Sequence, residues 1–444
     1  MSQINKTISR RGFLKSTVPA VAIPYIVPSF VLGVNNRPAP SNRITMGMIG
    51  LGSMGLRHVK GFLQEDDCRI LAVCDVDAGR RKVAVGEINA HYGGDDCSQY
   101  NDFRELIGRG DIDTLCIAVP DHWHAAIAMA GIRAGKDIYG EKPLARTIAE
   151  GRAIVNTVNR YNCVWQTGSW QRSTEHFRFG CELVRNERIG KLLRVEVGIG
   201  GGYDPGGGKP TVNRIDPQPV MPVPDGFDYQ MWLGPAPWAA YTEKRCHWNF
   251  RWILDYSGGQ VTDWGCHHID IAQWGMNCDN TGPVEVTGGG VFPADGLWNT
   301  AVDFDFECSY GNGLLMRVAS NNHIPQGVRF IGEAGWIHIT RAGLKTNPAG
   351  LRQTIIGPDE IHLPRPAGDN RQGHRRDFLD CVKTRKATMS PARVGHRAAA
   401  VAHLGNIAIL SRRKIKWDPK YEQIIADPSA NRMLSRAMHS PWRL

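Results

Sequence analysis

One short glycine-rich stretch constrains the fold of this chain more than any other feature. Gly50, Gly52 and Gly55 have the spacing G-x-G-x-x-G, directly after an apolar run at 43–50 and directly before a helical run at 56–63. Glycines at these places allow a tight turn and a close approach of the backbone to a pyrophosphate at the amino end of the helix. The motif alone is a weak signal, but between a strand and a helix it predicts a dinucleotide site. The residues expected to contact the pyrophosphate are Gly50, Gly52, Ser53, Met54 and Gly55.

An acidic residue stands where a site of this type recognises the ribose. Asp75 lies 20 residues after Gly55, near the end of the next apolar run. A carboxylate there hydrogen-bonds the 2′-hydroxyl of the adenosine ribose and repels a 2′-phosphate. The sequence therefore predicts NAD(H) rather than NADP(H) as the cofactor, with Asp77 as a weaker candidate for the same contact.

Strand-like and helical runs alternate as far as about residue 167. The apolar runs at 69–77, 111–120 and 136–143 are separated by helical stretches, and Thr147 with Glu150 forms a capping box before a further helix. Strand–helix alternation of this kind predicts a parallel, doubly wound sheet.

The pattern changes from about residue 168. Strand-like runs such as 192–200, 301–310 and 313–320 come without helices between them, which is typical of an antiparallel sheet. A chain of 444 residues is also too long for one ordinary core. We therefore predict an α/β protein with an N-terminal doubly wound parallel sheet and a C-terminal α+β domain whose sheet is open and mostly antiparallel. The predicted divisions are residues 1–42 for a signal and linker, 43–167 for the nucleotide-binding domain and 168–444 for the substrate and oligomerisation domain.

Three polar motifs accompany the glycine motif. They are the sequence PDHWH at 120–124, Glu141-Lys142-Pro143, and the pattern D-x-G-x-H-x-x-D at 263–270. The four motifs, in this order, resemble the glucose–fructose oxidoreductase, inositol dehydrogenase and rhizopine-catabolism family (Gfo/Idh/MocA) over about residues 43–410. The resemblance implies a Rossmann domain followed by an α/β domain with an open antiparallel sheet, and we expect a homo-oligomer, a dimer or a tetramer. A tryptophan-rich insert around 231–241 prevents the transfer of any one member's substrate.

The resemblance gives Lys142, Asp263 and His267 the catalytic roles. Asp263 and His267 are four residues apart, so a helix would place them on one face, where the carboxylate can orient the imidazole. His267 is suited to remove a hydroxyl proton because histidine has an ordinary pKa of about 6.5. Lys142 would stabilise the developing alkoxide. Strand ends are where doubly wound folds bind ligands, so the further predicted cofactor contacts are Asp121, His124, Glu141 and Lys142.

The adjacent histidines also suggest a metal site at His267, His268 and Asp270. Successive residues on a helix point about 100° apart, so neighbouring histidines rarely bind one ion. We therefore predict no metal. The 11 cysteines never have the spacing C-x-x-C, which argues against a structural zinc site as well.

Aromatic rings and forked hydrogen-bond donors near these motifs suit a polyol or a sugar. We predict an NAD(H)-dependent oxidoreductase that acts on a secondary hydroxyl or ketone of a sugar, glycoside or cyclitol. The alternatives are a glycosidase that oxidises its substrate transiently with bound NAD, and a catalytically silent sugar-binding protein. For His268, a place in the substrate cleft and a buried structural hydrogen bond both remain open. The predicted substrate contacts are Trp170, Gln171, Arg172, His247, Arg251, Trp264 and His268.

The net charge of +10 does not indicate a nucleic-acid partner. The chain has 53 basic and 43 acidic residues, and its basic clusters are short. Neither zinc-finger spacing nor an aromatic–basic pattern for binding single strands accompanies them. The basic residues are therefore expected to lie on a solvated surface.

The first residues resemble a twin-arginine export signal. The segment 9–16 reads SRRGFLKS, and an apolar stretch interrupted by prolines follows it. That stretch is too short and irregular to span a bilayer comfortably, and no clean A-x-A cleavage site follows it. We predict that the protein is periplasmic and that the twin-arginine machinery is its export partner. Cleavage of the signal and its retention as a membrane anchor both remain open. Because this route exports folded proteins, NAD(H) is predicted to be tightly bound, covered by the loop 200–226 or by residues before Arg43.

Overall fold

The computed structural model describes residues 42–201 and 218–444. By its internal contacts the chain divides into residues 1–43 and the compact unit 44–444, and the second unit is described below. The predicted export signal lies outside the described residues, as does most of the loop 200–226.

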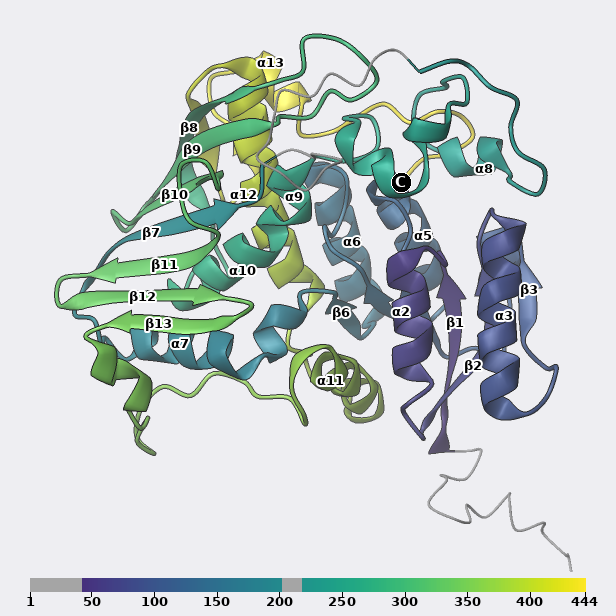
Figure 1. The fold of residues 1–444 in the computed structure, drawn as a ribbon, viewed down its shortest axis with the longest axis horizontal. Helices are drawn as coiled ribbons and strands as arrows, with labels where there is room; N and C mark the ends of the chain where they lie inside the picture. Colours follow the sequence, from purple (N-terminus) through teal and green to yellow (C-terminus); the bar gives the residue numbers. More distant parts are fainter. Residues whose placement is uncertain (1–41, 202–217) are drawn as a thin grey trace, which may run out of the picture. The chain divides into compact units, whose positions relative to one another are not determined.

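The first sheet contains six parallel strands within residues 42–201, in the order β3-β2-β1-β4-β5-β6 (Figure 1). Its central strands are apolar and buried, as expected for a parallel sheet covered by helices on both faces. This arrangement confirms the predicted doubly wound domain. The strands are β1 (Ile44–Ile49), β2 (Cys68–Cys74), β3 (Ser98–Tyr100), β4 (Thr114–Ile117), β5 (Asp137–Gly140) and β6 (Trp165–Thr167). The helices are α2 (Ser53–Phe62), α3 (Ala78–Tyr92), α4 (Phe103–Ile107), α5 (Asp121–Arg133) and α6 (Ile148–Tyr161).

The predicted capping box before α6 is only half formed. The Thr147 side chain accepts a hydrogen bond from the Glu150 backbone N–H, as a helix cap should. The Glu150 carboxylate does not return to Thr147, because it accepts a hydrogen bond from Arg436 Nε at 2.7 Å. A residue close to the C-terminus therefore fixes the first turn of α6.

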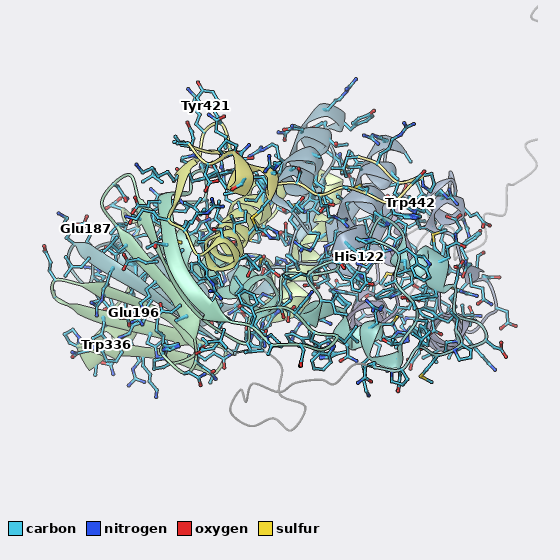
Figure 2. The ribbon with its side chains drawn as sticks, turned by 90° about the horizontal axis from the view of Figure 1, so that it is seen from above. His122, Glu187, Glu196, Trp336, Tyr421 and Trp442 are labelled. Carbon is cyan, nitrogen blue, oxygen red and sulfur yellow. The ribbon has the colours of Figure 1, made fainter. Side chains whose placement is uncertain are left out.

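The second sheet contains nine strands over the described part of the chain, in the order β13-β12-β11-β7-β10-β9-β8-β14-β15. Every neighbouring pair is antiparallel except β7 with β10, so the predicted open and mostly antiparallel sheet is confirmed. The outer face of this second sheet carries polar and charged side chains such as Glu196. Figure 2 shows Glu196 and Trp336 on strands of this sheet. The strands are β7 (Leu192–Ile199), β8 (Pro283–Val291), β9 (Asp303–Tyr310), β10 (Leu315–Ser320), β11 (Gly327–Gly332), β12 (Gly335–Thr340), β13 (Gly343–Asn347), β14 (Ile415–Asp418) and β15 (Gln423–Ile424).

Helices of the C-terminal part connect the two sheets. Helix α12 contacts α6 of the first domain as well as β8 and β9 of the second sheet, and α10 lies against β7 and β11 (Figure 1). Phe378 and Leu379 of α11 join the buried cluster that contains Met46 and Phe62, so late residues complete the core of the first domain. The helices are η3 (Trp170–Ser173), α7 (Glu175–Arg185), α8 (Tyr229–Leu233), η4 (Glu243–Arg245), η5 (His247–Trp252), α9 (Gln260–Asp263), α10 (Gly265–Gly275), η6 (Ala349–Gln353), α11 (Asn370–Thr384), α12 (Ala392–Ser411) and α13 (Pro428–Arg432).

None of the helices within residues 42–201 and 218–444 has the length and apolar character that crossing a bilayer requires.

Candidate active site

A cleft of about 330 Å³ lies at the carboxyl ends of the first sheet's strands. This is the edge at which doubly wound folds bind their ligands. Lining residues come from the glycine loop, from the ends of β2, β4 and β5, and from the segments 231–232 and 247–251. The predicted contacts found on its wall are Gly50, Gly52, Ser53, Met54, Asp75, Asp121, Glu141, Lys142, His247, Arg251 and Asp263.

The glycine loop is shaped to hold an anion at the start of α2. Gly50 has a φ of +86°, which favours glycine, and a Cβ on Gly55 would lie 1.9 Å from the Gly50 carbonyl oxygen. Gly52 is the N-cap of α2, and no side chain caps the helix or adds an acidic group in its first turn. The first N–H groups of α2 are therefore available to a phosphate. The loop fits the pyrophosphate of a dinucleotide.

Asp75 joins this loop to the end of β2. Its carboxylate accepts hydrogen bonds from the Leu51 N–H at 2.6 Å and from the Asp77 N–H at 2.9 Å. Burial raises the pKa of Asp75, and the nearby charge of Arg80 opposes that rise. Asp77 has a different position, because its side chain caps α3 by accepting from the Arg80 N–H. Asp75 is thus the acidic group that faces the cleft where a ribose would bind.

The substitution Asp75→Ser is expected to narrow the preference for NAD(H) over NADP(H). A hydrogen bond to a charged group contributes about 1.5–3 kcal/mol, so the ratio of the two dissociation constants should change about 10-fold or more. Titration of both cofactors into the two proteins measures this ratio. Asp77→Ser is the matched control, since serine preserves the cap of α3. A general loosening of the loop would weaken the binding of both cofactors alike. An unchanged ratio of the two dissociation constants in Asp75→Ser would show that Asp75 does not contact the ribose.

The cleft is partly enclosed beside β2 by a distant segment. Ala78 N–H donates to the Gly226 carbonyl and Asp228 N–H to the Val76 carbonyl, both at 2.9 Å, so this segment lies along the loop that follows β2. Arg80 Nη2 and His247 Nδ1 are 2.6 Å apart. His247, predicted to bind substrate, lines the cleft and pairs through its ring nitrogen with the Arg80 guanidinium.

Lys142 and Asp263 form an ion pair on the wall of the same cleft. Lys142 Nζ donates to Asp263 Oδ1 at 2.5 Å and to the Asp263 backbone carbonyl at 3.0 Å. Arg251 Nε lies 3.4 Å from the same carboxylate oxygen. Burial alone would raise the pKa of Asp263, but the charges of Lys142 and Arg251 hold it below its ordinary value. The carboxylate is therefore ionised and positions both cations.

The predicted pairing of Asp263 with His267 is not present. The His267 N–H donates to the Trp264 carbonyl, one residue short of the α-helical pattern, which leaves the Asp263 carbonyl to Lys142. His267 Nδ1 is buried and has no partner among the described residues. Burial, together with the positive charge of Lys142, holds the pKa of His267 well below its ordinary value. His267 is consequently neutral, which is the form that can accept a proton.

His124 and Arg172 are both predicted to contact a ligand. In the structure, each of them instead makes contacts within the protein. His124 is buried, and its ring nitrogens lie 2.7 Å from the Pro143 carbonyl and 2.9 Å from the Val119 carbonyl. Arg172 is 3% exposed and forms ion pairs with Asp270 and Asp279. His124 thus connects two loops at strand ends, and the charge of Arg172 is neutralised by two carboxylates. Neither side chain presents a free polar group to a ligand.

The remaining predicted substrate residues gather beside His267. The Trp170 and Trp264 rings have centroids 6.4 and 6.1 Å from the His267 ring, and Trp264 is 5.6 Å from His268. Gln171 Nε2 lies 3.5 Å from His268 Nδ1. The buried His268 Nε2 and Trp170 Nε1 have no partner among the described residues. This cluster therefore offers several unused hydrogen-bonding groups.

Several neighbours of the site carried no signal in the sequence. His58 of α2 lies 2.7 Å from Glu141 Oε1 and holds the pKa of this buried carboxylate low. Arg341, in the turn between β12 and β13, and Arg371, in the first turn of α11, approach Trp170 from later parts of the chain. Only the tertiary fold brings them to the site.

Metal-binding groups were sought among the described residues. No cluster of three or more histidine, cysteine, aspartate or glutamate side chains in residues 42–201 and 218–444 is arranged to hold an ion.

Family models cover nearly all of the compact unit. The model described as "Oxidoreductase family, NAD-binding Rossmann fold" matches residues 44–169. The model described as "Oxidoreductase family, C-terminal alpha/beta domain" matches residues 177–444. The four sequence motifs thus lie within these two matched regions.

Curated relatives are similar over a smaller part. The chain is 30% identical over 220 residues to an α-N-acetylgalactosaminidase of Shewanella oneidensis, which covers 43% of this chain and 45% of that protein. It is 32% identical over 168 residues to a glycosyl hydrolase family 109 protein of Shewanella sp. strain W3-18-1, which covers 34% of each. The chain thus spans less than half the length of these relatives.

Solved structures share the fold over nearly their whole length. An aldose–aldose oxidoreductase from Caulobacter crescentus, complexed with glycerol, has a TM-score of 0.61 and 18% identity, over 84% of this chain and 99% of that one. The WlbA dehydrogenase from Bordetella pertussis, in complex with NADH and UDP-GlcNAcA, has a TM-score of 0.60 and 15% identity, over 85% and 99%. At these identities the likeness concerns the fold.

Proposed function

Because the chain belongs to the Gfo/Idh/MocA oxidoreductase family, we propose that it transfers hydride between NAD(H) and a secondary hydroxyl or ketone of a sugar, glycoside or cyclitol. One observation carries this proposal. The Lys142–Asp263 ion pair lies in the same cleft as the glycine loop and Asp75. A cofactor bound along the cleft would have its ribose at one end and these charged groups at the other.

The residues suit the oxidation of an alcohol. NAD, when bound, supplies the hydride acceptor. Lys142 holds the substrate oxygen and stabilises the negative charge that develops on it as the proton leaves. The neutral imidazole of His267 accepts that proton. Asp263 positions Lys142 through two contacts, from its carboxylate and its backbone carbonyl. In the reverse direction the same groups protonate a ketone oxygen.

Oxidation of a sugar can be followed on the purified holoprotein. It is incubated with a panel of sugars, glycosides and cyclitols while the absorbance of the bound nicotinamide is recorded. At least one member should reduce bound NAD, and a ketone acceptor should reoxidise it. If none of them changes the nicotinamide spectrum of a protein that holds NAD, the oxidoreductase proposal is wrong.

A glycosidase is the second candidate, since the curated relatives at 30% and 32% identity bear glycosidase names. Such an enzyme would oxidise a ring carbon, eliminate the leaving group and then reduce the ring carbon again. The same experiment on aryl glycosides separates the two activities. Release of the aglycone with no net NADH identifies the glycosidase. A silent sugar-binding protein would do neither, and the presence of Lys142, Asp263 and His267 argues against it.

Protein purified without added nucleotide and then denatured is expected to release close to one NAD(H) per chain. We propose that the protein is exported folded by the twin-arginine route, so its cofactor must be acquired before export. Two observations support slow release: residues 226–228 are hydrogen-bonded to the loop that follows β2, and Arg80 contacts His247. His247→Ala should lower the retained amount. An empty site with rapid, weak binding would contradict the proposal.

A further inference from the structure

Two arginines beside His267 form no ion pair within the part of the chain that the structure describes. The guanidinium carbons of Arg341 and Arg371 lie 4.8 and 4.2 Å from the centroid of the Trp170 ring. Arg341 also lies 4.0 Å from the Trp264 ring. Among residues 42–201 and 218–444, neither arginine forms an ion pair, and the buried Nε of each has no hydrogen-bond partner. Both guanidinium groups instead lie over aromatic faces.

Several partly or fully buried arginines among the described residues are neutralised by carboxylates, whereas Arg375, which is also buried, forms no ion pair there. Arg172 pairs with two aspartates, Arg178 with Glu182, and Arg376 with Glu65, Asp67 and Asp380. Burying an unpaired charge is costly, because the lost hydration is not replaced. Burial lowers the pKa of Arg341 to about 10, and the charge of Arg371 adds to this effect. The charges of Asp263 and Glu141 act on Arg341 and Arg371 from beyond ion-pair distance, so a bound anion would supply the direct partner that both guanidinium groups lack among the described residues.

This cationic group belongs to the candidate active site. The charges of Arg341 and Arg371 both lower the pKa of His267, so they act on the group that would accept the substrate proton. The unpartnered buried atoms Trp170 Nε1 and His268 Nε2 lie in the same cluster. A substrate held at Lys142 and His267 would thus have unused donors and two cations beside it.

We propose that the substrate is an anionic sugar, whose carboxylate or sulfate ester is bound by Arg341 and Arg371. This inference rests on the proposed function, since it concerns the substrate of that same site. The planar guanidinium is suited to both anions because its N–H donors form a fork that can bind two oxygens together. The cation–π contacts with Trp170 help to hold the two guanidinium groups in place, and the Nε of each has no hydrogen-bond partner among the described residues.

The test compares matched charged and neutral sugars on the purified holoprotein. Glucuronate, glucose 6-sulfate and glucose are titrated by calorimetry into the wild type, Arg341→Gln and Arg371→Gln. At least one anionic sugar should bind the wild type 10-fold or more tightly than glucose. Each variant should lose about 10–100-fold for that sugar, the range for hydrogen bonds to charged groups, and little for glucose. Preference for glucuronate or for the sulfate ester identifies the anion.

Arg317→Gln is the control, since Arg317 pairs with Asp305 on an exposed part of β10 and should bind as the wild type does. Equal affinity for charged and neutral sugars, unchanged in both variants, overturns the inference. A changed oligomeric state in either variant, measured by sedimentation, also overturns it, because the arginines then pair with a second copy. Anion-dependent binding without any change in nicotinamide absorbance keeps the inference and contradicts the proposed function. If only neutral sugars reduce bound NAD, the proposed function is kept and the inference about an anionic substrate is contradicted.

Discussion

Lys142→Met is expected to reduce kcat by 10²-fold or more while the cofactor remains bound, because the loss of one group that stabilises a developing oxyanion typically costs about 10²–10³-fold. Methionine keeps the length and apolar stem of lysine but removes the ammonium. The substitution leaves Asp263 with Arg251 as its neighbouring cation. The glycine loop and Asp75 have no hydrogen bond or ion pair with Lys142, so they are expected to keep their geometry.

The measurement combines turnover with cofactor content. NAD(H) released on denaturation of Lys142→Met should equal that of the wild type, which separates a catalytic loss from a binding loss. Lys60→Met is the matched control, because Lys60 is an exposed lysine on α2 that pairs with Glu87. Near-wild-type turnover in Lys142→Met would remove this lysine from the reaction.

The first domain was predictable because its signals are local. A glycine motif between a strand and a helix, Asp75 at the next strand end, and strand–helix alternation each lie within a few tens of residues. The structure places the glycine loop, Asp75 and Lys142 along one cleft as these patterns indicate. Local sequence patterns are sufficient to predict this cleft, because parallel strands bring their carboxyl ends to one edge of the sheet.

The details of the candidate active site depend on contacts between distant residues. Helical spacing predicted that Asp263 would face His267, yet a lysine 121 residues earlier in the chain takes both its carboxylate and its carbonyl. Arg172 was predicted to be a free forked donor, but Asp270 and Asp279 neutralise it. Arg341 and Arg371 belong to none of the sequence motifs, so no local pattern points to them. Ion pairs of this kind are decided by tertiary packing and burial, which residue spacing does not encode.

Gly55→Ala is expected to abolish cofactor retention and to destabilise the protein. A Cβ at this position would lie 1.9 Å from the Gly50 carbonyl oxygen, which is backbone and cannot rotate away. The loop must therefore shift, and overpacking of this kind costs about 1–3 kcal/mol of stability. The same shift moves the N–H groups that would hold the pyrophosphate. The affinity for NAD(H) should fall by about 100-fold, as expected when two or more hydrogen bonds to a charged ligand are lost.

A second glycine separates this steric effect from a general effect of replacing glycine. Gly86 lies inside α3, and a Cβ there would meet nothing within 4 Å. Gly86→Ala should therefore retain NAD(H) and gain about 0.5–1 kcal/mol, because alanine loses less backbone entropy in a helix. Cofactor content and denaturant unfolding of both variants are compared with the wild type. If Gly55→Ala keeps its full complement of NAD(H), the close approach of Gly50 and Gly55 does not shape the phosphate site, and the dinucleotide must bind elsewhere along the cleft.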